Sequence, residues 1–479
     1  MASIYLYMQG TEQIGILAEK SDVQEVQIVR PEAVSRVGNI YLGKVVNIET
    51  SLQAAFVDFG GGKFGFLPKK EVPEARVDGD RPLESLLTEG QRIIVQVVKD
   101  AYQQKGAQLT ANITVPGIHV VYLPFGNYVA VSRKLSEEQR EAWKKEGNRW
   151  VTDCEGAIIR TSSQSADKAS LQAEWQQLRH QWKNIEKTAQ NGPVPSSLFM
   201  EFPLSKWIRK FRPNELESIF VNQVQAANQL KKELPSHEAL IHWQKQLPLS
   251  VPLDHLLESI LSPKVSTTEG VELWIEQTEA LTVVDVNSST FRKGWTKEDA
   301  VFLTNKVAAI EIAKQLRLRN ISGIIMIDFI KMKSTSNQQK LLHIFQTALK
   351  KDAIRTEVYG FTKLGLLEMT RKREAESLPS ILGGTFRDFK TFSSETYAFL
   401  LERELLERKE EALIVDVHPQ VLQFFKEKIM PNSVGQVHIA VFMKENENVN
   451  GFNIIRSGSQ ETINEYIAAI PSDAIDKVF

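Results

Sequence analysis

The chain has 479 residues, of which 42% are hydrophobic and 24% charged, and its 58 lysines and arginines against 59 aspartates and glutamates give a net charge of -1. A chain of this length predicts two to four domains, since one domain takes about 100–200 residues. The single cysteine, Cys154, excludes an internal disulfide and a CxxC zinc site, and it is typical of a reducing cytosol. No apolar run approaches the roughly 18 residues of a membrane helix, and the start, MASIYLYMQG, is a poor secretory signal. We therefore expect a cytoplasmic protein without a membrane segment.

Short strands dominate the first 110 residues. Four segments are rich in β-branched and aromatic residues and are separated by glycine and proline: IYLGKVVNI, AAFVDFG, GKFGFLP and RIIVQVVKD. Several such strands in about 75 residues predict a small barrel. Further strands are expected in TANITVPGIHVVYLP and in YVAVS.

A long helix is predicted next, over residues 165–186. Its apolar residues recur at helical spacing and form one stripe: Leu171, Trp175, Leu178 and Trp182. Such a stripe favours a helix that packs on a core. Several prolines mark 187–203 as a boundary, and helix-rich sequence follows to about residue 261.

The region from about 265 to 375 alternates strands and helices. Strands are predicted in VELWIE, ALTVVDVN, GIIMIDFI and RTEVYGFT, and helices over 296–319 and 336–352. On the first of these helices four apolar residues share a face: Ala309, Ile312, Ala313 and Leu316. This order predicts an α/β layer. From about 391, a charged helix, a short helix and the strands LIVDVHP, VHIAVFM and FNIIR predict a small α+β domain.

Two aspartates, Asp285 and Asp328, lie at or near the carboxyl ends of predicted apolar strands. Carboxylates are rare in such strands unless they are paired or metal-bound, and active sites of α/β sheets gather at these ends. Two carboxylates from neighbouring strands suit Mg²⁺, which activates water and stabilises charge on a phosphate. Asn287 follows Asp285 by two residues and so faces the same side. The alternative is that both aspartates are strand-end caps or turn residues.

Basic runs flank the two aspartate strands and allow two interpretations. They are KQLRLR at 314–319, the lysine pair before Arg355, and TRKR at 370–373. Such side chains could hold a phosphate backbone. Charge runs are more often solvated helix faces, and the pattern alone favours that interpretation.

Aromatic residues of the predicted barrel are a weaker signal. Phe56 and Phe66 could stack on bases and Lys105 could contact phosphate, although phenylalanine in a strand is more often core. Arg160 and Thr161 end the strand GAIIRT, where they could grip a terminal phosphate. For Cys154, which has no motif context, the default interpretation is a buried structural thiol. P-loop, GxGxxG and HExxH motifs are absent from the sequence, and none of the eight histidines forms a spaced metal pair.

Several long strings, taken together, resemble the ribonuclease E/G family, the bacterial endoribonucleases of RNA processing and decay. They are NIYLGKVVNIETSLQAAFVDFGGGKFGFLP, KGAQLT, EALTVVDVNSS, AKQLRLRNISGIIMIDFI and GLLEMTRKR. They occur in the family's order and at about its spacing. The resemblance covers nearly the whole chain, more loosely after about residue 375.

The resemblance implies a multidomain fold of α/β and α+β parts. An RNase H-like subdomain is split into 1–34 and 204–268, and it receives an OB-fold, S1-motif RNA-binding module at 35–110 and a 5′-sensor region at 111–203. A DNase I-like catalytic subdomain at 269–385 and a small C-terminal α+β domain at 386–479 follow. The strand and helix pattern agrees with this order but could not have found the split.

The resemblance also implies roles for individual residues. Asp285 and Asp328 match the Mg²⁺-binding aspartates, Asn287 matches the asparagine that positions the scissile phosphate or its attacking water, and Arg355 falls near the catalytic site. The RNA-binding positions of the barrel are Phe56, Phe66 and Lys105. The pocket for a 5′ monophosphate is matched by Gly117, Val121, Arg160 and Thr161. These matches favour the functional interpretation of the aspartates over the turn interpretation.

The implied activity is Mg²⁺-dependent cleavage of single-stranded, AU-rich RNA that leaves a 5′ phosphate and a 3′ hydroxyl. The alternative is a non-catalytic RNA-binding protein that kept the fold, and a DNA nuclease is a weaker third. The intact aspartates and asparagine favour the enzyme.

Two departures from the family pattern stand out. The family's CxxC zinc link between protomers follows GLLEM, but here the sequence is TRKREAESLPSILGGTF, so we expect no zinc link and leave a homo-oligomer without zinc open. A glycine-rich loop after the Arg-Thr pair is replaced by SSQSADK, which puts phosphate sensing in doubt. The long scaffold of the E-type enzymes is not present either, and the chain resembles the short G-type.

Overall fold

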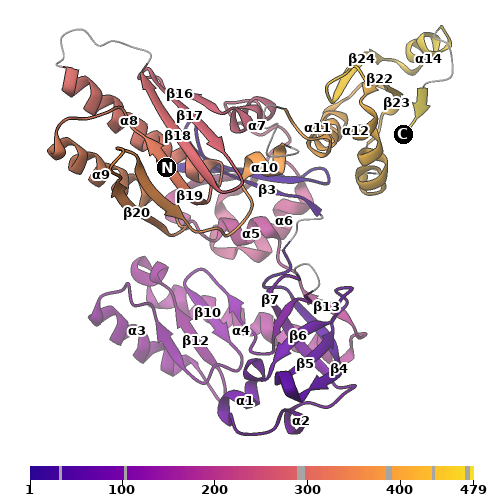
Figure 1. Cartoon of the computed structure of the whole chain (residues 1–479). Helices are drawn as coiled ribbons and strands as arrows, with labels where there is room; N and C mark the ends of the chain where they lie inside the picture. Colours follow the sequence, from indigo (N-terminus) through magenta and orange to yellow (C-terminus); the bar gives the residue numbers. More distant parts are fainter. Residues whose placement is uncertain are drawn as a thin grey trace. The chain divides into compact units, whose positions relative to one another are not determined.

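The computed structural model describes residues 1–31, 35–101, 105–288, 297–383, 391–433, 437–469 and 475–478. The chain forms two compact units (Figure 1). The first unit comprises Met1–Pro31, Leu216–Lys232 and His237–Phe479, and the second comprises Glu32–Glu215 and Glu233–Ser236. The chain therefore leaves the first unit after Pro31 to build nearly all of the second, returns at Leu216, and enters the second unit again only for Glu233–Ser236.

A closed barrel occupies the start of the second unit. Its strands are β4 (Ile40–Glu49), β5 (Ala54–Asp58), β6 (Gly65–Pro68), β8 (Gln108–Thr110) and β7 (Arg92–Lys99), and β7 pairs with β4 to close it. Strand β13 (Ser196–Phe199) adds to β4, and the short helices α1 (Pro73–Val77) and α2 (Leu83–Leu86) lie between β6 and β7 in the chain. Alternate strand residues fill the interior, among them Val45, Val57, Leu67 and Leu109. The predicted small barrel is confirmed.

The rest of the second unit is a four-stranded sheet with helices against it. The strand order is β11 (Val129–Val131), β12 (Gly156–Ile159), β10 (Val120–Leu123) and β9 (Val115–Pro116). Helices α3 (Glu137–Trp150) and α4 (Lys168–Asn191) are followed by α5 (Pro203–Ile208). The predicted stripe of α4 is buried, and the helix begins at Lys168 because the Asp167 side chain accepts a hydrogen bond from the Ser170 amide.

One sheet of the first unit contains strands from before and from after the main segment of the second unit. Its order is β15 (Ile241–Trp243), β14 (Leu216–Val221), β1 (Ala2–Tyr7), β2 (Gln13–Glu19) and β3 (Asp22–Val29), with helices α6 (Val224–Glu233) and α7 (Leu253–Leu261). Strand β1 pairs in parallel with β14, so residues from both sides of the second unit share this sheet. The RNase H-like label for it stays a prediction.

The second sheet of the first unit is mixed. Its order is β16 (Lys264–Ser266), β17 (Val271–Gln277), β18 (Leu281–Ser288), β19 (Gly323–Asp328), β21 (Leu367–Arg371) and β20 (Thr356–Phe361). Helices α8 (Lys297–Leu318) and α9 (Thr335–Leu349) pack on one face, where the predicted stripe of α8 is buried. The expected α/β layer is confirmed, and β21 is a strand that the sequence pattern missed.

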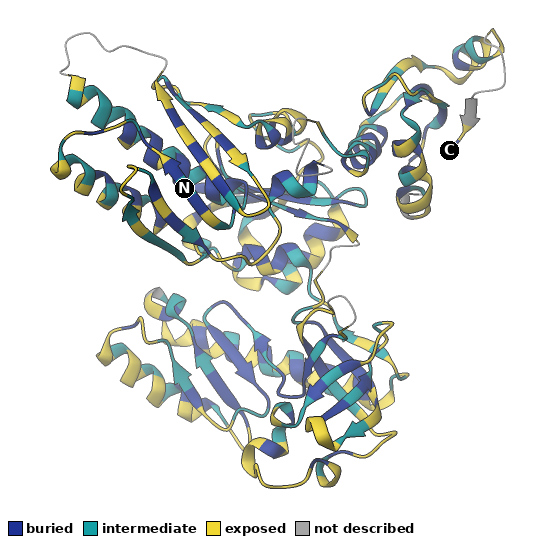
Figure 2. Ribbon diagram, viewed as in Figure 1, coloured by how far each residue is buried: buried dark blue, intermediate teal, exposed yellow. Residues whose placement is uncertain are grey.

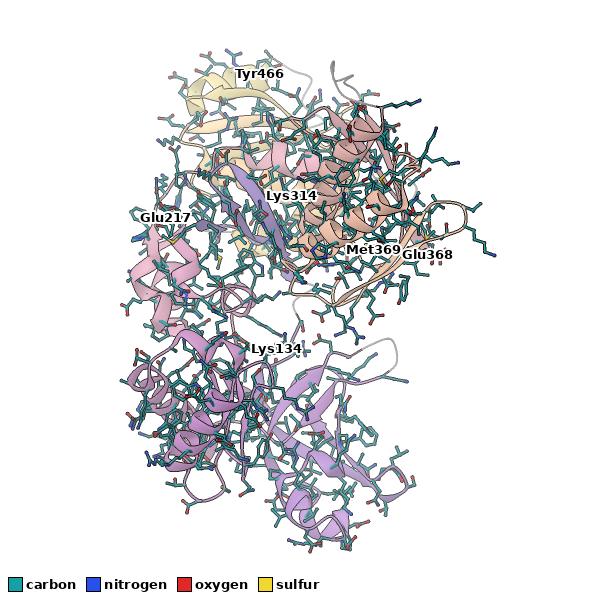
Figure 3. All side chains as sticks on the ribbon, turned by 90° about the vertical axis from the view of Figure 1, so that its left-hand side faces the viewer. Lys134, Glu217, Lys314, Glu368, Met369 and Tyr466 are labelled. Carbon is teal, nitrogen blue, oxygen red and sulfur yellow. The ribbon has the colours of Figure 1, made fainter. Side chains whose placement is uncertain are left out.

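The other side of this sheet, which we call the open face, carries residues that alternate with the core. Figure 2 shows this alternation as bands of buried and exposed residues along β17 and β18. In β21, Glu368 is exposed while its neighbour Met369 is buried in the core (Figure 3). The open face is formed by Lys264, Glu272, Trp274, Glu276, Val283, Asp285, Asn287, Ile324, Met326, Asp328 and Glu368.

The C-terminal part of the first unit combines helices with a four-stranded sheet, and its division as a separate domain stays a prediction. After α10 (Leu378–Leu382) come α11 (Ser394–Glu407), α12 (Pro419–Phe424), the π-helix Phe425–Ile429, α13 (Met430–Ser433) and α14 (Gln460–Ala468). The sheet order is β24 (Phe452–Gly458), β22 (Ala412–Val417), β23 (Ala440–Glu445) and β25 (Ile475–Lys477). Among the described helices of the whole chain, none has the length and apolarity to cross a membrane.

Candidate functional site

The two predicted carboxylates are neighbours across a strand pair. Strands β18 and β19 run in parallel, and Asp285 and Asp328 are register partners that face the same side. Both are exposed, and the side-chain nitrogen of Asn287 donates a hydrogen bond to Asp285 Oδ2 at 2.7 Å. Neighbouring strands lie about 4.8 Å apart, so the two carboxylates can reach one ion. Asp285 lies inside the strand ladder, which argues against a turn or cap role.

This donor set fits Mg²⁺ and not zinc. Mg²⁺ takes one or two carboxylates and keeps several waters, whereas structural zinc needs four nitrogen or sulfur ligands. In the described ranges, no cluster of three or more His, Cys, Asp or Glu side chains could hold a metal ion. Asp285 and Asp328, with the amide oxygen of Asn287 nearby, are the residues that would hold Mg²⁺.

Arg355 lies far from the carboxylates within its own sheet. It precedes β20, whose Thr356 pairs with Arg371, and Arg371 pairs in turn with Gly323 at the start of β19. Asp328 ends β19, five residues after Gly323, which places it about 16 Å further along the strands. The Arg355 guanidinium instead forms an exposed ion pair with Glu357. The structure does not bring Arg355 to the carboxylate pair.

The basic runs beside the aspartate strands are largely structural. Arg319 is 2% exposed and donates to Gln315 Oε1 and to the Ser262 carbonyl, both at 2.7 Å. Arg371 is 3% exposed and forms an ion pair with Asp352 at 2.7 Å. A phosphate cannot reach guanidinium groups that are buried in this way. For these two arginines the phosphate-binding and solvated-face interpretations are both wrong.

The aromatic pair of the barrel lies on its surface. Phe56 and Phe66 are register partners on β5 and β6, both half-buried, with ring centroids 5.9 Å apart in an edge-to-face arrangement. Lys105 is exposed, and the next residue, Gly106, packs so closely on the Phe64 backbone that a Cβ there would lie 2.0 Å from its carbonyl oxygen. Phe64 is 52% exposed and was missed by the sequence interpretation. The barrel therefore offers three aromatic rings and a lysine.

Of the four residues predicted to bind a 5′ phosphate, Val121 lies in β10, Gly117 and Arg160 directly follow β9 and β12, and Thr161 begins a short 3-10 helix. Gly117 and Val121 flank the turn between β9 and β10, and the Arg160 amide at the end of β12 donates to the His119 carbonyl at 2.7 Å. The hydroxyls of Thr161 and Ser132 hydrogen-bond at 2.7 Å. The Val121 side chain is buried, so only its backbone and its packing are available for the predicted role in phosphate binding.

Glu174 of α4 contacts the backbone beside these four residues, and the sequence did not reveal it. Its carboxylate accepts hydrogen bonds from the backbone amides of Ile118 and His119, the latter at 3.1 Å. A Cβ on Gly117 would lie 2.3 Å from Glu174 Oε1, so only glycine leaves room for this approach. Burial raises the pKa of Glu174, while the two amides and the positive charge of Arg160 act against that rise. The carboxylate therefore occupies backbone donors of the kind that bind anions.

Arg209, just after α5, is a second cation close enough to Arg160 to interact with it. It donates to the Pro116 carbonyl at 2.8 Å and forms an ion pair with Glu201. Burial, followed by the positive charge of Arg160, lowers the pKa of Arg209 to about 10. The sequence gave no signal for Arg209, since it lies more than forty residues after the Arg-Thr pair.

Two serines of the SSQSADK loop, which follows Arg160 and Thr161, hydrogen-bond to backbone carbonyls at or next to these residues. Ser162 Oγ donates to the Ile118 carbonyl at 2.6 Å, and Ser163, fully buried, donates to the Arg160 carbonyl at 2.7 Å. Cys154, expected to be buried, is exposed, and its thiol contacts the Pro124 carbonyl at 3.4 Å. The expectation for Cys154 was wrong because it lies in the turn that precedes β12, and not in a strand.

Comparisons with known proteins identify the family to which this chain belongs. The model of the ribonuclease E/G family matches residues 114–374, over half of the chain, and the model of the S1 RNA binding domain matches residues 35–112. Ribonuclease G of Escherichia coli (strain K12) is 35% identical over 380 residues, which cover 75% of this chain and 77% of that protein. Ribonuclease G of Haemophilus influenzae is 34% identical over 384 residues, covering 76% and 78%, and ribonuclease E of a Synechocystis species is 33% identical over 391 residues, covering 78% and 57%. By these matches, the chain belongs to the ribonuclease E/G family.

Proposed function

We propose that this chain is a Mg²⁺-dependent endoribonuclease that cleaves single-stranded RNA in RNA processing and decay, and that it senses a 5′ monophosphate. The observation that carries the proposal is the register pairing of Asp285 with Asp328 on the open face, in a chain of this family. Both carboxylates are exposed and therefore accessible to an ion and to a substrate strand.

The residues of the open face have separate tasks in this proposal. Asp285 and Asp328 hold Mg²⁺, which when bound supplies a positive charge for the phosphate and a more acidic water. Asn287, by its hydrogen bond to Asp285 Oδ2, fixes the direction of that carboxylate. Its amide can also orient the scissile phosphate, because it lies two residues further along the same face.

The second unit binds the substrate in this proposal. Phe56 and Phe66 stack on bases, and Lys105 contacts the backbone, which suits a strand without sequence preference. Arg160 and Thr161 bind the 5′ phosphate through a guanidinium and a hydroxyl. Since a single cysteine cannot supply a CxxC link, any homo-oligomer of this chain assembles without that zinc.

The decisive test is a magnesium-titrated cleavage assay on a 5′-monophosphorylated single-stranded oligonucleotide. We expect cleavage that needs Mg²⁺ and is lost in Asp285→Asn and in Asp328→Asn. Cleavage by either variant at the wild-type rate would refute the assignment of the carboxylates. Binding of the oligonucleotide without any cut, at every magnesium concentration, would support a non-catalytic RNA-binding protein instead.

A further inference from the structure

A row of four side chains crosses the open face at the level of the carboxylate pair. Lys264 on β16 is the register partner of Trp274 on β17, Trp274 is the partner of Asp285, and Asp285 is the partner of Asp328. Register partners of one sheet face the same side, so a cation, an aromatic ring and two carboxylates form one line.

Trp274 is exposed although it lies in the middle of a strand. Its side chain is 40% exposed, whereas its neighbours Leu273 and Ile275 are buried on the other side of the sheet. The indole is not among the residues of the hydrophobic core on the other side of the sheet, and it lies beside a carboxylate of the candidate metal site. It offers a flat surface on which any base can stack.

Lys264 stands one strand further from the carboxylates. Its ammonium forms an ion pair with Glu272 at 2.9 Å, and the two side chains are 42% and 28% exposed. An exposed pair of this kind is worth little, so the lysine can exchange Glu272 for a phosphate at small cost. The open face otherwise carries several carboxylates, including Glu276 and Glu368. Since these repel the phosphates of a nucleic acid, binding of a phosphate is most favourable next to a cation such as Lys264.

The spacing of the row suits a nucleotide next to the reacting phosphate. Strands of a sheet lie about 4.8 Å apart, which places Trp274 about 5 Å and Lys264 about 10 Å from Asp285 along the row. We propose that Trp274 and Lys264 form a nucleotide subsite, in which the indole stacks on the base beside the scissile phosphate and the ammonium contacts the following phosphate. This inference rests on the proposed function and extends it by giving the RNA substrate a specific path across the open face.

The first test compares Trp274→Ala with Trp274→Phe on a single-stranded oligonucleotide. We expect Trp274→Ala to raise KM roughly five- to hundredfold with a smaller change in kcat, because loss of one stacked base weakens ground-state and transition-state binding alike. Phenylalanine keeps a ring and should restore most of the loss. The matched control is Trp243→Ala, since Trp243 is 54% exposed on the edge strand β15 of the other sheet. An unchanged KM for Trp274→Ala would overturn the subsite.

The second test measures binding without cleavage, in the Asp285→Asn background. We expect Trp274→Ala to weaken binding of the oligonucleotide, and Lys264→Gln to lower by about one the slope of log affinity against log salt. Because this readout needs no cut, it can fail while cleavage itself is confirmed, so a failure of the subsite is distinguishable from a failure of the proposed function. A change in the mass of the protein in solution on Trp274→Ala, with RNA affinity unchanged, would overturn the proposal and assign the indole to contact with a second copy of the chain.

Discussion

The carboxylates of the open face and Glu174, in the proposed 5′-phosphate pocket, lie in opposite environments. Asp285 and Asp328 are exposed and adjacent, and Asn287 is a polar partner of the first. Glu174 is partly buried against backbone amides and next to Arg160. Two adjacent negative charges in water attract a cation, whereas a carboxylate that already has donors fixes the chain around it. The comparison separates a pair of carboxylates that is open to a cation from a single carboxylate whose donors belong to the chain itself.

The largest expected effect comes from removing one charge of the exposed pair. Asp285→Asn should lower the cleavage rate by more than about a hundredfold, because even residues that only support a metal ligand cost 10–100-fold. Single-turnover cleavage at saturating Mg²⁺ measures this. Glu276→Gln is the matched control on the same face, and it should cleave at least as fast as the wild type. A similar loss in both variants would mean that the general charge of the face matters, and not the pair.

A buried charge of the same sheet should affect stability and not chemistry. Arg371→Ala leaves Asp352 buried without its partner, so we expect a loss of about 3–5 kcal/mol in the free energy of unfolding of the first unit. Urea unfolding followed by circular dichroism measures it. Arg355→Ala is the control, since its side chain is 77% exposed and its solvent-screened ion pair should contribute little to stability. If Arg355→Ala lowers the cleavage rate without changing stability, the predicted catalytic role of Arg355 is supported despite its position.

In the 5′ pocket, Arg160→Ala should remove the preference for a 5′ monophosphate. We expect the ratio of cleavage rates for 5′-monophosphate and 5′-hydroxyl RNA to fall about tenfold, since a hydrogen bond to a charged group contributes about 1.5–3 kcal/mol. Arg149→Ala, an exposed arginine at the end of α3, should keep the wild-type ratio. Equal rates for both substrates in the unmodified protein would contradict phosphate sensing altogether.

The sequence pattern predicted what depends on local order. The stripe of α4, the apolar face of α8 and the barrel strands follow from residue spacing, and the strings around Asp285 and Asp328 follow from resemblance. What it missed depends on pairing between distant segments. Glu174 contacts an amide 56 residues away, and the line from Lys264 to Asp328 exists only through the register of four strands. Burial of Arg371 likewise depends on the pairing of β21. The basic residues at the end of this strand kept the sequence pattern from predicting it.

The smallest effect, and the sharpest test of the comparison, is expected for Glu174→Gln. The amide oxygen of glutamine can still accept from Ile118 and His119, but the negative charge beside Arg160 is lost. A 5′ phosphate would then bind in a more positive pocket, and the rate ratio of 5′-monophosphate to 5′-hydroxyl RNA should rise roughly fourfold, the value for one unit charge about 5 Å away in water. Glu174→Ala removes the acceptor as well, so the turn loosens and the ratio should fall. If both variants lower the ratio equally, Glu174 acts through the effect of its charge on Arg160. The Glu174 carboxylate would then assist phosphate binding, which contradicts our expectation that it competes with the phosphate.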